Sequence, residues 1–541
     1  MSRIRFILAI VACILTMTAS RAVPIRRGRR PLLSESFIQT DRDNPLLWNR
    51  QNGVPFATKS ASPGAYATNN MSRTGKKEFL LVLAEFKDRH FTLSDTEAIQ
   101  RRYEKIFNSD EYNDTVYFRG NRYITTGSVS DYFKSQSYGQ FEPVFKIVGP
   151  IQVAYGYATY GKDKNNTDAD GVERLVKELC DSLARRGINL ADFDNDGDGN
   201  LESFSVIFAG RGQNYEGAEE DAIWPQASTL SLSRYSIRYL DFLCTCELFW
   251  DSDSVPDGIG TFCHEFSHTL GLPDFYINNS STASALGYWS LMDHGTYENE
   301  GFSPVGYTAF EKYSLGWMDI EEIDAPGRYW LSDISNKPDP DAEIHTAYRI
   351  NSENDKENKF ILLENHNKEG WYKYQKSEGL MVTVVSYSKY NWERNLVNQS
   401  ASSKHYYILP ADNDNSWDSG EGDLFPYNGN DSLTPLSKPK MDMTLFKLYG
   451  IERRGNMVTF TARDRYTQIG YTTAPATVIE CTDGMLSVHA PTGCLIEVYD
   501  IAGKKLVDAV MDSPVWQYRF TDSGYYIVKC GNVVRKLKIE K

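Results

Sequence analysis

Two histidines flank a glutamate at a spacing typical of catalytic zinc sites. His264 and His268 are four residues apart, so a helix would present both imidazoles on one face, where they can bind one zinc ion. Zinc on neutral histidines lowers the pKa of a bound water toward about 7, and a neighbouring carboxylate can accept its proton during attack on a peptide carbonyl. The spacing therefore predicts metal-assisted hydrolysis with Glu265 as the general base.

The residues after this motif offer a third ligand. Gly271 follows His268 by three residues, where a residue without Cβ can end the helix in a left-handed turn. Asp274 comes three residues later and can return as an oxygen ligand that leaves a fourth position open for water. In an alternative architecture the third ligand is a downstream glutamate. The candidates for it are Glu298, Glu300 and Glu311.

A methionine in the segment Trp289-Ser290-Leu291-Met292 favours Asp274. Metzincins place a methionine in a tight turn beneath the metal, and Met292 has that place in the chain order. A methionine can also simply fill the core. Gly271 and Met292 together favour a zinc set of His264, His268 and Asp274, while His294 is interpreted as a surface or supporting histidine.

A second candidate metal site lies in an acidic stretch. Starting at Asp194, side-chain oxygens recur every second residue, with glycine at the sixth position and an apolar residue at the eighth, as at the start of a calcium loop. Position twelve is Ser205 rather than glutamate, so no complete EF-hand is present. The alternative is an exposed acidic turn, but neighbouring carboxylates repel one another unless a cation lies among them. The predicted calcium ligands are Asp194, Asp196, Asp198, Asn200 and Glu202.

Bulk properties exclude some functions. A formal net charge of -14 over 541 residues argues against broad nucleic-acid binding, which needs a basic surface. The N-terminus has Arg3 and Arg5, then an apolar run over 6–17 and small residues up to Ala22, which predicts a secretory signal peptide. The run is shorter than the ~20 residues of a membrane span, so no stable span is expected. A lipoprotein signal at Cys13 is the minor alternative.

Hydrophobic patterns predict an α/β (α+β) catalytic domain, then a β-rich region and a small β-sandwich. A buried strand begins at Phe79, a helix covers 172–183 and a second buried strand covers 204–209. Strand-like segments dominate after Trp317. The predicted domains are a signal peptide at 1–22, a propeptide at 23–75, a zinc protease catalytic domain at 76–320, a β-rich accessory part at 321–470 and a β-sandwich at 471–541.

Over about residues 76–463 the chain resembles the immune inhibitor A family of secreted metallopeptidases. The resemblance rests mainly on the His264 helix. It is supported by Phe79-Leu80-Leu81-Val82-Leu83, Asp131-Tyr132-Phe133, the Asp194 loop, Trp289-Ser290-Leu291-Met292 and Leu363-Glu364-Asn365. It implies a metzincin-like catalytic domain, calcium binding, a propeptide and protein substrates. Because 23–75 contains no cysteine, a cysteine-based latency switch is excluded.

The C-terminal part resembles the sorting domain of the type IX secretion route of Bacteroidetes. The resemblance rests on the segments at 498–504, 524–528 and 535–538, the last of which is basic. It implies recognition by secretion machinery and a bacterial protein that is secreted or held at the cell surface. An accessory β-sandwich, for example for adhesion, has the same pattern.

The sequence thus predicts an exported zinc endopeptidase that hydrolyses proteins. The rival from another class is a noncatalytic exported binding or adhesion protein with a zinc-stabilised fold. Glu265 separates the two, because a structural zinc site needs no carboxylate beside an open coordination position. Amidase or esterase activity at the same metal is a third option, although a long β-rich region better suits an extended polymer.

Overall fold

The fold was analysed in a computed structural model, which describes most of the chain after Ser72. The described residues are 20–22, 72–161, 168–214, 221–249, 252–277, 285–339, 344–356, 358–414, 420–434, 437–438, 446–464, 478–482, 484–490, 493–530 and 533–539. Nearly all of the predicted signal peptide and propeptide lies outside them. The chain divides into two compact units, Met1–Asp464 and Arg465–Lys541. The domain limits given above stay predictions.

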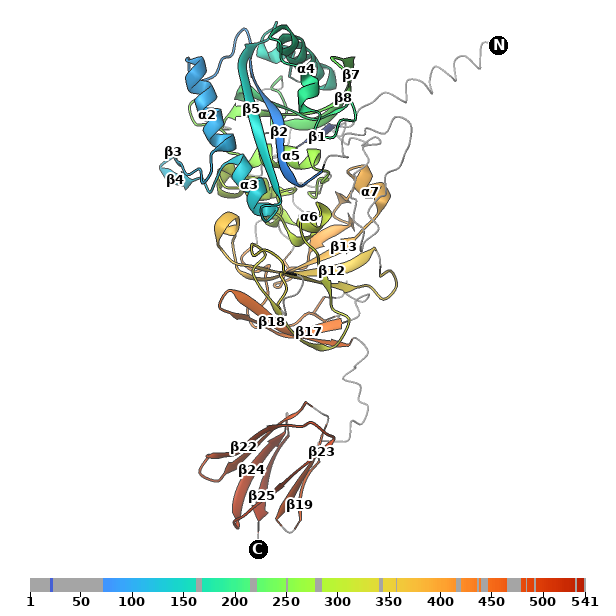
Figure 1. Ribbon diagram of the computed structural model, residues 1–541. Coiled ribbons are helices and arrows are strands. Elements are labelled where there is room, and N and C mark those ends of the chain that lie inside the picture. The colour runs from blue at the N-terminus through green and yellow to red at the C-terminus, as the bar shows by residue number, and fades with distance from the viewer. Residues whose placement is uncertain are drawn as a thin grey trace, which may run out of the picture. The chain divides into compact units, whose positions relative to one another are not determined.

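The first unit is built around a mixed six-stranded sheet. Its strand order is β1-β7-β8-β6-β2-β5. The strands β5, β2, β6 and β8 are parallel, β7 is antiparallel to β8, and the edge strand β1 is antiparallel to β7. Figure 1 shows β2 and β5 side by side. The strands are β1 (Ser20–Ala22), β2 (Gly75–Glu85), β5 (Phe141–Gln152), β6 (Leu201–Arg211), β7 (Gln226–Arg234) and β8 (Ile237–Leu248). The mixed α/β character predicted for this region is therefore present.

Both faces of the sheet are covered, which explains the continuous apolar run at 79–84. Successive side chains of a strand point to opposite faces. Phe79, Leu81 and Leu83 enter one core, whereas Leu80 and Val82 enter another. The first core also takes residues of α2 (Thr96–Asn108), α3 (Val129–Gln136) and α5 (Gly260–Thr269), and the second takes those of α4 (Asp168–Arg185).

Several helix ends carry the capping residues that their sequences suggest. The Asp95 side chain accepts a hydrogen bond from the Ala98 amide at the start of α2. Ser128 and Asp131 form a reciprocal capping box at α3, and Thr308 and Glu311 form one at α6 (Ala309–Ser314). These caps satisfy backbone N–H groups that have no partner within the first turn.

The remainder of the first unit is rich in strands. One five-stranded sheet has the order β16-β13-β12-β11-β9, with only the β9–β11 pair parallel, and an antiparallel three-stranded sheet has the order β10-β18-β17. In Figure 1, α6 lies between the large sheet and β12 and β13. Their bounds are β9 (Glu321–Glu322), β10 (Gly327–Leu331), β11 (Ala347–Asn351), β12 (Lys359–His366), β13 (Gly379–Ser386), β16 (Tyr406–Ile408), β17 (Phe446–Arg454) and β18 (Met457–Asp464). The shorter elements include the hairpins β3 (Thr115–Phe118)–β4 (Asn121–Ile124) and β14 (Asn398–Ser400)–β15 (Ser403–Lys404), and the helix α7 (Lys389–Glu393).

The second unit consists of two antiparallel sheets that share one buried apolar cluster. Their orders are β19-β20-β23 and β22-β21-β24-β25. The strands are β19 (Val478–Thr482), β20 (Met485–His489), β21 (Leu495–Asp500), β22 (Lys505–Val510), β23 (Val515–Arg519), β24 (Gly524–Cys530) and β25 (Val533–Ile539). Of the segments that resemble a sorting domain, 498–504 begins in β21 and 524–528 lies in β24. In the described parts of both units, no helix is long and apolar enough to cross a membrane.

Candidate metal centre

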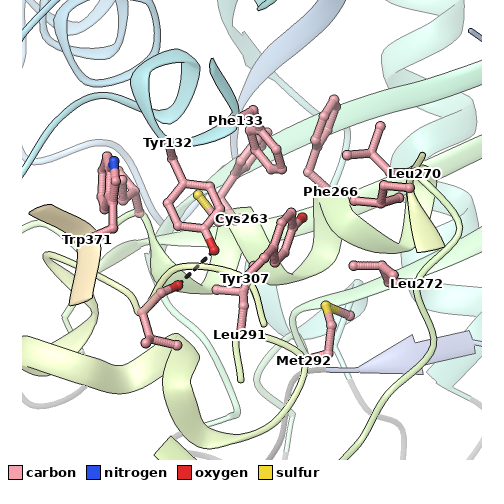
Figure 2. Close-up of a cluster of buried hydrophobic side chains, with 14 of the residues drawn as sticks. Tyr132, Phe133, Cys263, Phe266, Leu270, Leu272, Leu291, Met292, Tyr307 and Trp371 are labelled. Atoms are coloured by element: carbon pink, nitrogen blue, oxygen red, sulfur yellow. Dashed lines mark hydrogen bonds between the residues drawn. The ribbon is translucent and has the colours of Figure 1, made fainter. Parts of the chain in front are cut away.

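The helix α5 carries His264, Glu265 and His268 in the interior of the first unit. Every residue of α5 is buried, so both faces of the helix are in contact with protein. Phe262 and Phe266 anchor it, because their rings pack edge-on against Phe145 of β5 at centroid distances of 5.4 Å. Figure 2 shows Phe266 among the neighbouring apolar side chains, with Tyr132 donating a hydrogen bond to the Val305 carbonyl. Aromatic packing on the sheet therefore holds the histidines rigidly.

Each histidine has one ring nitrogen committed to a backbone carbonyl. Nδ1 of His264 lies 2.8 Å from the Leu291 oxygen, and Nδ1 of His268 lies 2.7 Å from the Leu272 oxygen. A carbonyl oxygen only accepts, so both Nδ1 atoms carry hydrogen and both Nε2 atoms are left for another partner. The neutral histidines therefore have the tautomer that binds a metal through Nε2.

Asp274 returns to the histidines through the turn at Gly271. Gly271 has a φ of 104°, and its amide and that of Leu272 bond back to the His268 and Ser267 carbonyls, which ends the helix. The Asp274 Oδ1 atom then lies 3.0 Å from Nε2 of His264 and 3.2 Å from Nε2 of His268. A tetrahedral zinc ion with bonds of about 2.0 Å separates its ligand atoms by about 3.3 Å. The three side chains therefore fit a zinc ion.

The electrostatic setting of Asp274 favours its ionised form. Burial alone would raise its pKa, but His268 and His264 outweigh burial and lower the pKa below its usual range. Glu265 is fully buried. Burial raises the pKa of Tyr276 well above its usual value, and the charges of Asp274 and Glu265 raise it further. Both carboxylates therefore lie near Tyr276. The centre thus holds an ionised carboxylate beside two imidazoles and a second carboxylate.

Met292 lies in a tight turn that is bonded to the segment carrying Asp274. Its carbonyl accepts a hydrogen bond from the amide of Phe275, the residue after Asp274, at 2.8 Å. The Met292 amide is bonded to Ser290 Oγ at 3.1 Å, and the Ser290 hydroxyl donates to Glu311 Oε1 at 2.6 Å. The turn is fully buried beside the Leu272 side chain (Figure 2). It therefore supports the chain on both sides of Asp274.

The structure places the alternative third ligands elsewhere. Among the described residues, only Asp274 brings a carboxylate oxygen within 4.8 Å of both histidine nitrogens. Glu311 caps α6 and holds the Met292 turn, with its pKa raised to about 7 by burial. Glu298 and Glu300 lie in the irregular segment after that turn. His294 is buried and paired with Asp293, whose Oδ1 is 2.5 Å from its Nδ1.

Two residues beside the metal centre were not expected from the sequence. Tyr276 bonds to the Asp274 carboxylate through its hydroxyl. Asn395 follows α7, 121 residues away in the chain, and contacts Asp274 twice. Tyr276 follows the motif by two residues, so its proximity was readable from the sequence. No local sequence pattern indicates that Asn395 lies beside Asp274.

The acidic loop partly brings its predicted residues together. One oxygen each of Asp194, Asp196 and Glu202 lie within 4.8 Å of one another. Glu202 is 1% exposed, burial raises its pKa to about 8, and its Oε1 atom has no hydrogen-bond partner. Asn200 is equally buried, and its Oδ1 atom also has no partner, while its amide nitrogen bonds to Asp198. Asp198 is not part of the carboxylate group.

Known proteins with similar sequences support the chemistry of the histidine cluster. Residues 65–320 match the family described as the immune inhibitor A peptidase M6 catalytic domain. The chain is 26% identical over 290 residues to immune inhibitor A from Bacillus thuringiensis subsp. alesti, which covers 46% of this chain and 42% of that protein. It is also 26% identical over 275 residues to the pre-pro-metalloprotease PrtV of Vibrio cholerae serotype O1, covering 44% of this chain and 29% of PrtV.

The matching region ends before the strand-rich part of the first unit, and the chain spans less than half the length of these relatives. All residues of the histidine cluster fall inside the match. Residues 65–320 therefore carry an M6 metallopeptidase catalytic domain, whose buried cluster of His264, His268 and Asp274 is consistent with a zinc site.

Proposed function

We propose that this protein is an exported zinc-dependent endopeptidase with a metzincin-like catalytic domain. One observation carries the proposal: Glu265 lies between two histidines that, together with Asp274, present three ligand atoms to one point. Three protein ligands are the number found in catalytic zinc sites, where a fourth position stays open. A structural site would be closed by a fourth protein ligand.

His264, His268 and Asp274 would hold the zinc ion, which supplies Lewis-acid activation of water and of the scissile carbonyl when bound. Glu265 accepts the proton of the attacking water and passes it to the departing amine. The Leu291 and Leu272 carbonyls keep both imidazoles in the ligand tautomer. The Tyr276 hydroxyl, which bonds to the Asp274 carboxylate, would help to hold that carboxylate in place.

A protein substrate in extended form fits the edge of the sheet. On the side away from β8, the strand β7 pairs antiparallel with the short segment β1, with Ser20 opposite Ser228 and Ala22 opposite Gln226. An edge strand that pairs with one extended segment can pair with another through the same backbone groups. Binding of an extended chain along β7 would favour endopeptidase activity over esterase activity on small molecules.

The test replaces Glu265 with alanine. We expect Glu265→Ala to bind zinc as the unaltered protein does and to lose about 10²–10⁴-fold in the rate of casein hydrolysis. A chelator should abolish wild-type proteolysis, and added zinc should restore it. Equal proteolysis by mutant and wild type would exclude this mechanism. Absence of proteolysis in both, with zinc bound, would instead favour a noncatalytic binding protein.

Calcium binding at the acidic loop is part of the proposal. The loop holds three clustered carboxylates and two buried oxygens without partners, those of Glu202 and Asn200. A buried carboxylate that lacks hydrogen bonds is costly in its ionised form. Calcium prefers carboxylate and amide oxygens of this kind, so it would compensate both the unpaired oxygens and the repulsion between Asp194 and Asp196.

Export and sorting are proposed from the two ends of the sequence. The apolar N-terminal stretch supports a signal peptide, followed by a propeptide up to residue 75. The paired antiparallel sheets of the second unit support a small β-sandwich. The resemblance of its sequence segments at 498–504, 524–528 and 535–538 to type IX sorting domains supports recognition by that secretion machinery. The test deletes 471–541 and measures the protein in culture medium: retention in the cell supports sorting, and unchanged secretion contradicts it.

A further inference from the structure

The two carboxylate oxygens of Asp274 have different partners. Oδ1 faces both histidine Nε2 atoms, at 3.0 and 3.2 Å. Oδ2 accepts a hydrogen bond from Nδ2 of Asn395 at 2.5 Å, and the backbone amide of Asp274 donates to Oδ1 of Asn395 at 2.7 Å. The asparagine thus uses both ends of its amide on one residue. Rotation of the Asp274 carboxylate would break at least one of these bonds.

The position of Asn395 is determined by the short helix α7. Trp392, in that helix, is 1% exposed and packs against Phe310 at 6.1 Å and Tyr387 at 5.1 Å between ring centroids. After the helix, Asn395 takes a left-handed conformation with φ 56°, which asparagine adopts more readily than most residues. The backbone amide of Asn395 donates a hydrogen bond to the Trp392 carbonyl. A buried tryptophan therefore anchors the turn that presents the asparagine.

A second asparagine from the same turn region holds the next residue of the loop. Asn398 is buried, and its Nδ2 atom donates to the Phe275 carbonyl at 2.6 Å and to the Tyr406 carbonyl at 2.7 Å. Beside Asp274, Asn398 contacts only the Phe275 backbone, and its Oδ1 atom accepts hydrogen bonds from the His405 and Tyr406 amides. Asn395, in contrast, contacts the Asp274 side chain itself. Asn398 and Asn395 can therefore be compared to separate two roles: holding the backbone of the segment at Asp274 and Phe275, and orienting the Asp274 carboxylate.

We propose that Asn395 is a positioning residue of the metal centre, which holds Asp274 with Oδ1 toward the zinc-binding nitrogens. The inference rests on the proposed zinc site. It also means that the strand-rich region after residue 320 is part of the catalytic unit, because a residue 75 positions beyond the matching segment orients its third ligand. Outer partners of metal ligands typically contribute 10- to 100-fold to metal affinity.

The test uses Asn395→Gly in the full-length chain. Glycine accepts the left-handed backbone, so this change removes the side chain without backbone strain. The matched control is Asn428→Gly: Asn428 is an exposed asparagine with φ 45° that forms no hydrogen bond to the metal centre. Zinc dissociation constants are measured by competition with a chromophoric chelator, and the folding of each metal-free variant by circular dichroism.

We expect N395G to bind zinc about 10- to 100-fold more weakly than wild type and N428G to be unchanged. Zinc affinity does not depend on turnover, so this result stands even if Glu265→Ala shows no loss of activity. The positioning role of Asn395 and the catalytic role of Glu265 can therefore be contradicted independently. In the active enzyme, N395G should need more zinc for half-maximal activity. Zinc affinity equal to wild type in folded N395G overturns the proposal.

Asn398→Ala separates orientation from loop seating. It removes the bonds to the Phe275 and Tyr406 carbonyls and those from the His405 and Tyr406 amides, but it leaves Asn395 in place. We therefore expect a lower Tm with zinc affinity within about threefold of wild type. If N398A weakens zinc binding as much as N395G, seating of the loop accounts for both and the specific role of Asn395 is wrong. Should N395G not fold, Asn395→Ser, whose side chain is too short to reach both groups of Asp274, carries the same comparison.

Discussion

The histidine cluster and the acidic loop both gather candidate metal ligands, but they do so in opposite ways. In the cluster, Asp274 is buried against two imidazoles, which lower its pKa. In the loop, Glu202 is buried near other carboxylates, and its pKa is raised to about 8, mainly by burial. The histidine cluster is thus held by protein contacts, whereas the loop has unpaired oxygens that a cation would stabilise. Burial alone does not decide whether the pKa of a carboxylate rises or falls, because the groups around the carboxylate can outweigh burial.

The largest expected effect is at the histidine cluster. His268→Ala removes one of the three proposed zinc ligands, so zinc binding and proteolysis should fall to background, while the acidic loop is untouched. Zinc content by atomic absorption and casein hydrolysis check this. The control is the shift in Tm on addition of calcium, which should equal that of wild type. Retained zinc-dependent proteolysis in H268A would contradict the ligand set.

The second largest expected effect is at the acidic loop. Calcium at about a thousand times its Kd should stabilise the first unit by about 4 kcal/mol, seen as a rise in Tm by differential scanning calorimetry. Glu202→Ala should remove this rise and leave zinc affinity unchanged. The same rise in E202A and wild type would show that calcium binds elsewhere. With H268A, this variant makes the two sites independently testable.

Asp423 provides a third buried carboxylate with a neutral partner. Trp289 Nε1 donates to its Oδ2 at 2.6 Å, and burial raises its pKa to about 6 from 3.8. The ionised form is disfavoured in the folded protein, so stability present below pH 4 is lost as the pH rises through about 6. The shift corresponds to at most about 3 kcal/mol.

Asp423→Asn keeps an acceptor for Trp289 without the charge. We expect D423N to have a higher Tm than wild type at pH 8, and the difference should vanish toward pH 4. Thermal unfolding in a series of buffers measures it. A difference between the two proteins that does not change with pH would show that Asp423 does not titrate in this range.

The smallest expected effect is at Gly271. Alanine at its φ of 104° is strained by about 1–2 kcal/mol, and relief of that strain would shift Asp274. Gly271→Ala should therefore lower both the Tm and the zinc affinity. The control is Gly187→Ala at the end of α4, with φ 76° and open space around a new Cβ, which should lower the Tm alone. Unchanged zinc affinity in G271A would mean that the turn does not orient the ligand.

Local patterns predicted much of the fold. The apolar run at 79–84 lies in β2, the helical pattern at 172–183 lies in α4, and the run at 204–209 lies in β6. These agree because burial on both faces or along one helical face imposes its own periodicity on the sequence. The antiparallel edge at β7 and β8 was not predicted, since strand direction depends on pairing between segments.

At the metal centre, too, only the convergence of residues close together in the sequence could be predicted. His264, His268, Gly271 and Asp274 span eleven residues, so helical spacing and one glycine turn were enough to propose their convergence. The role of Glu311 was partly readable from the Thr308 capping box, which a sequence signature marks, yet it was considered only as a ligand. Its bond to Ser290 depends on how α6 packs against the Met292 turn.

The sequence by itself determined the chemistry of this protein: the residue types, their spacing on one helix and the turn that follows. Tertiary structure alone decided which nitrogen of each histidine faces Asp274, which oxygen of Asp274 faces them, and that Asn395 holds the other oxygen. The physical reason is that ligand identity follows from local geometry, whereas ligand orientation depends on hydrogen bonds to groups brought close only by folding.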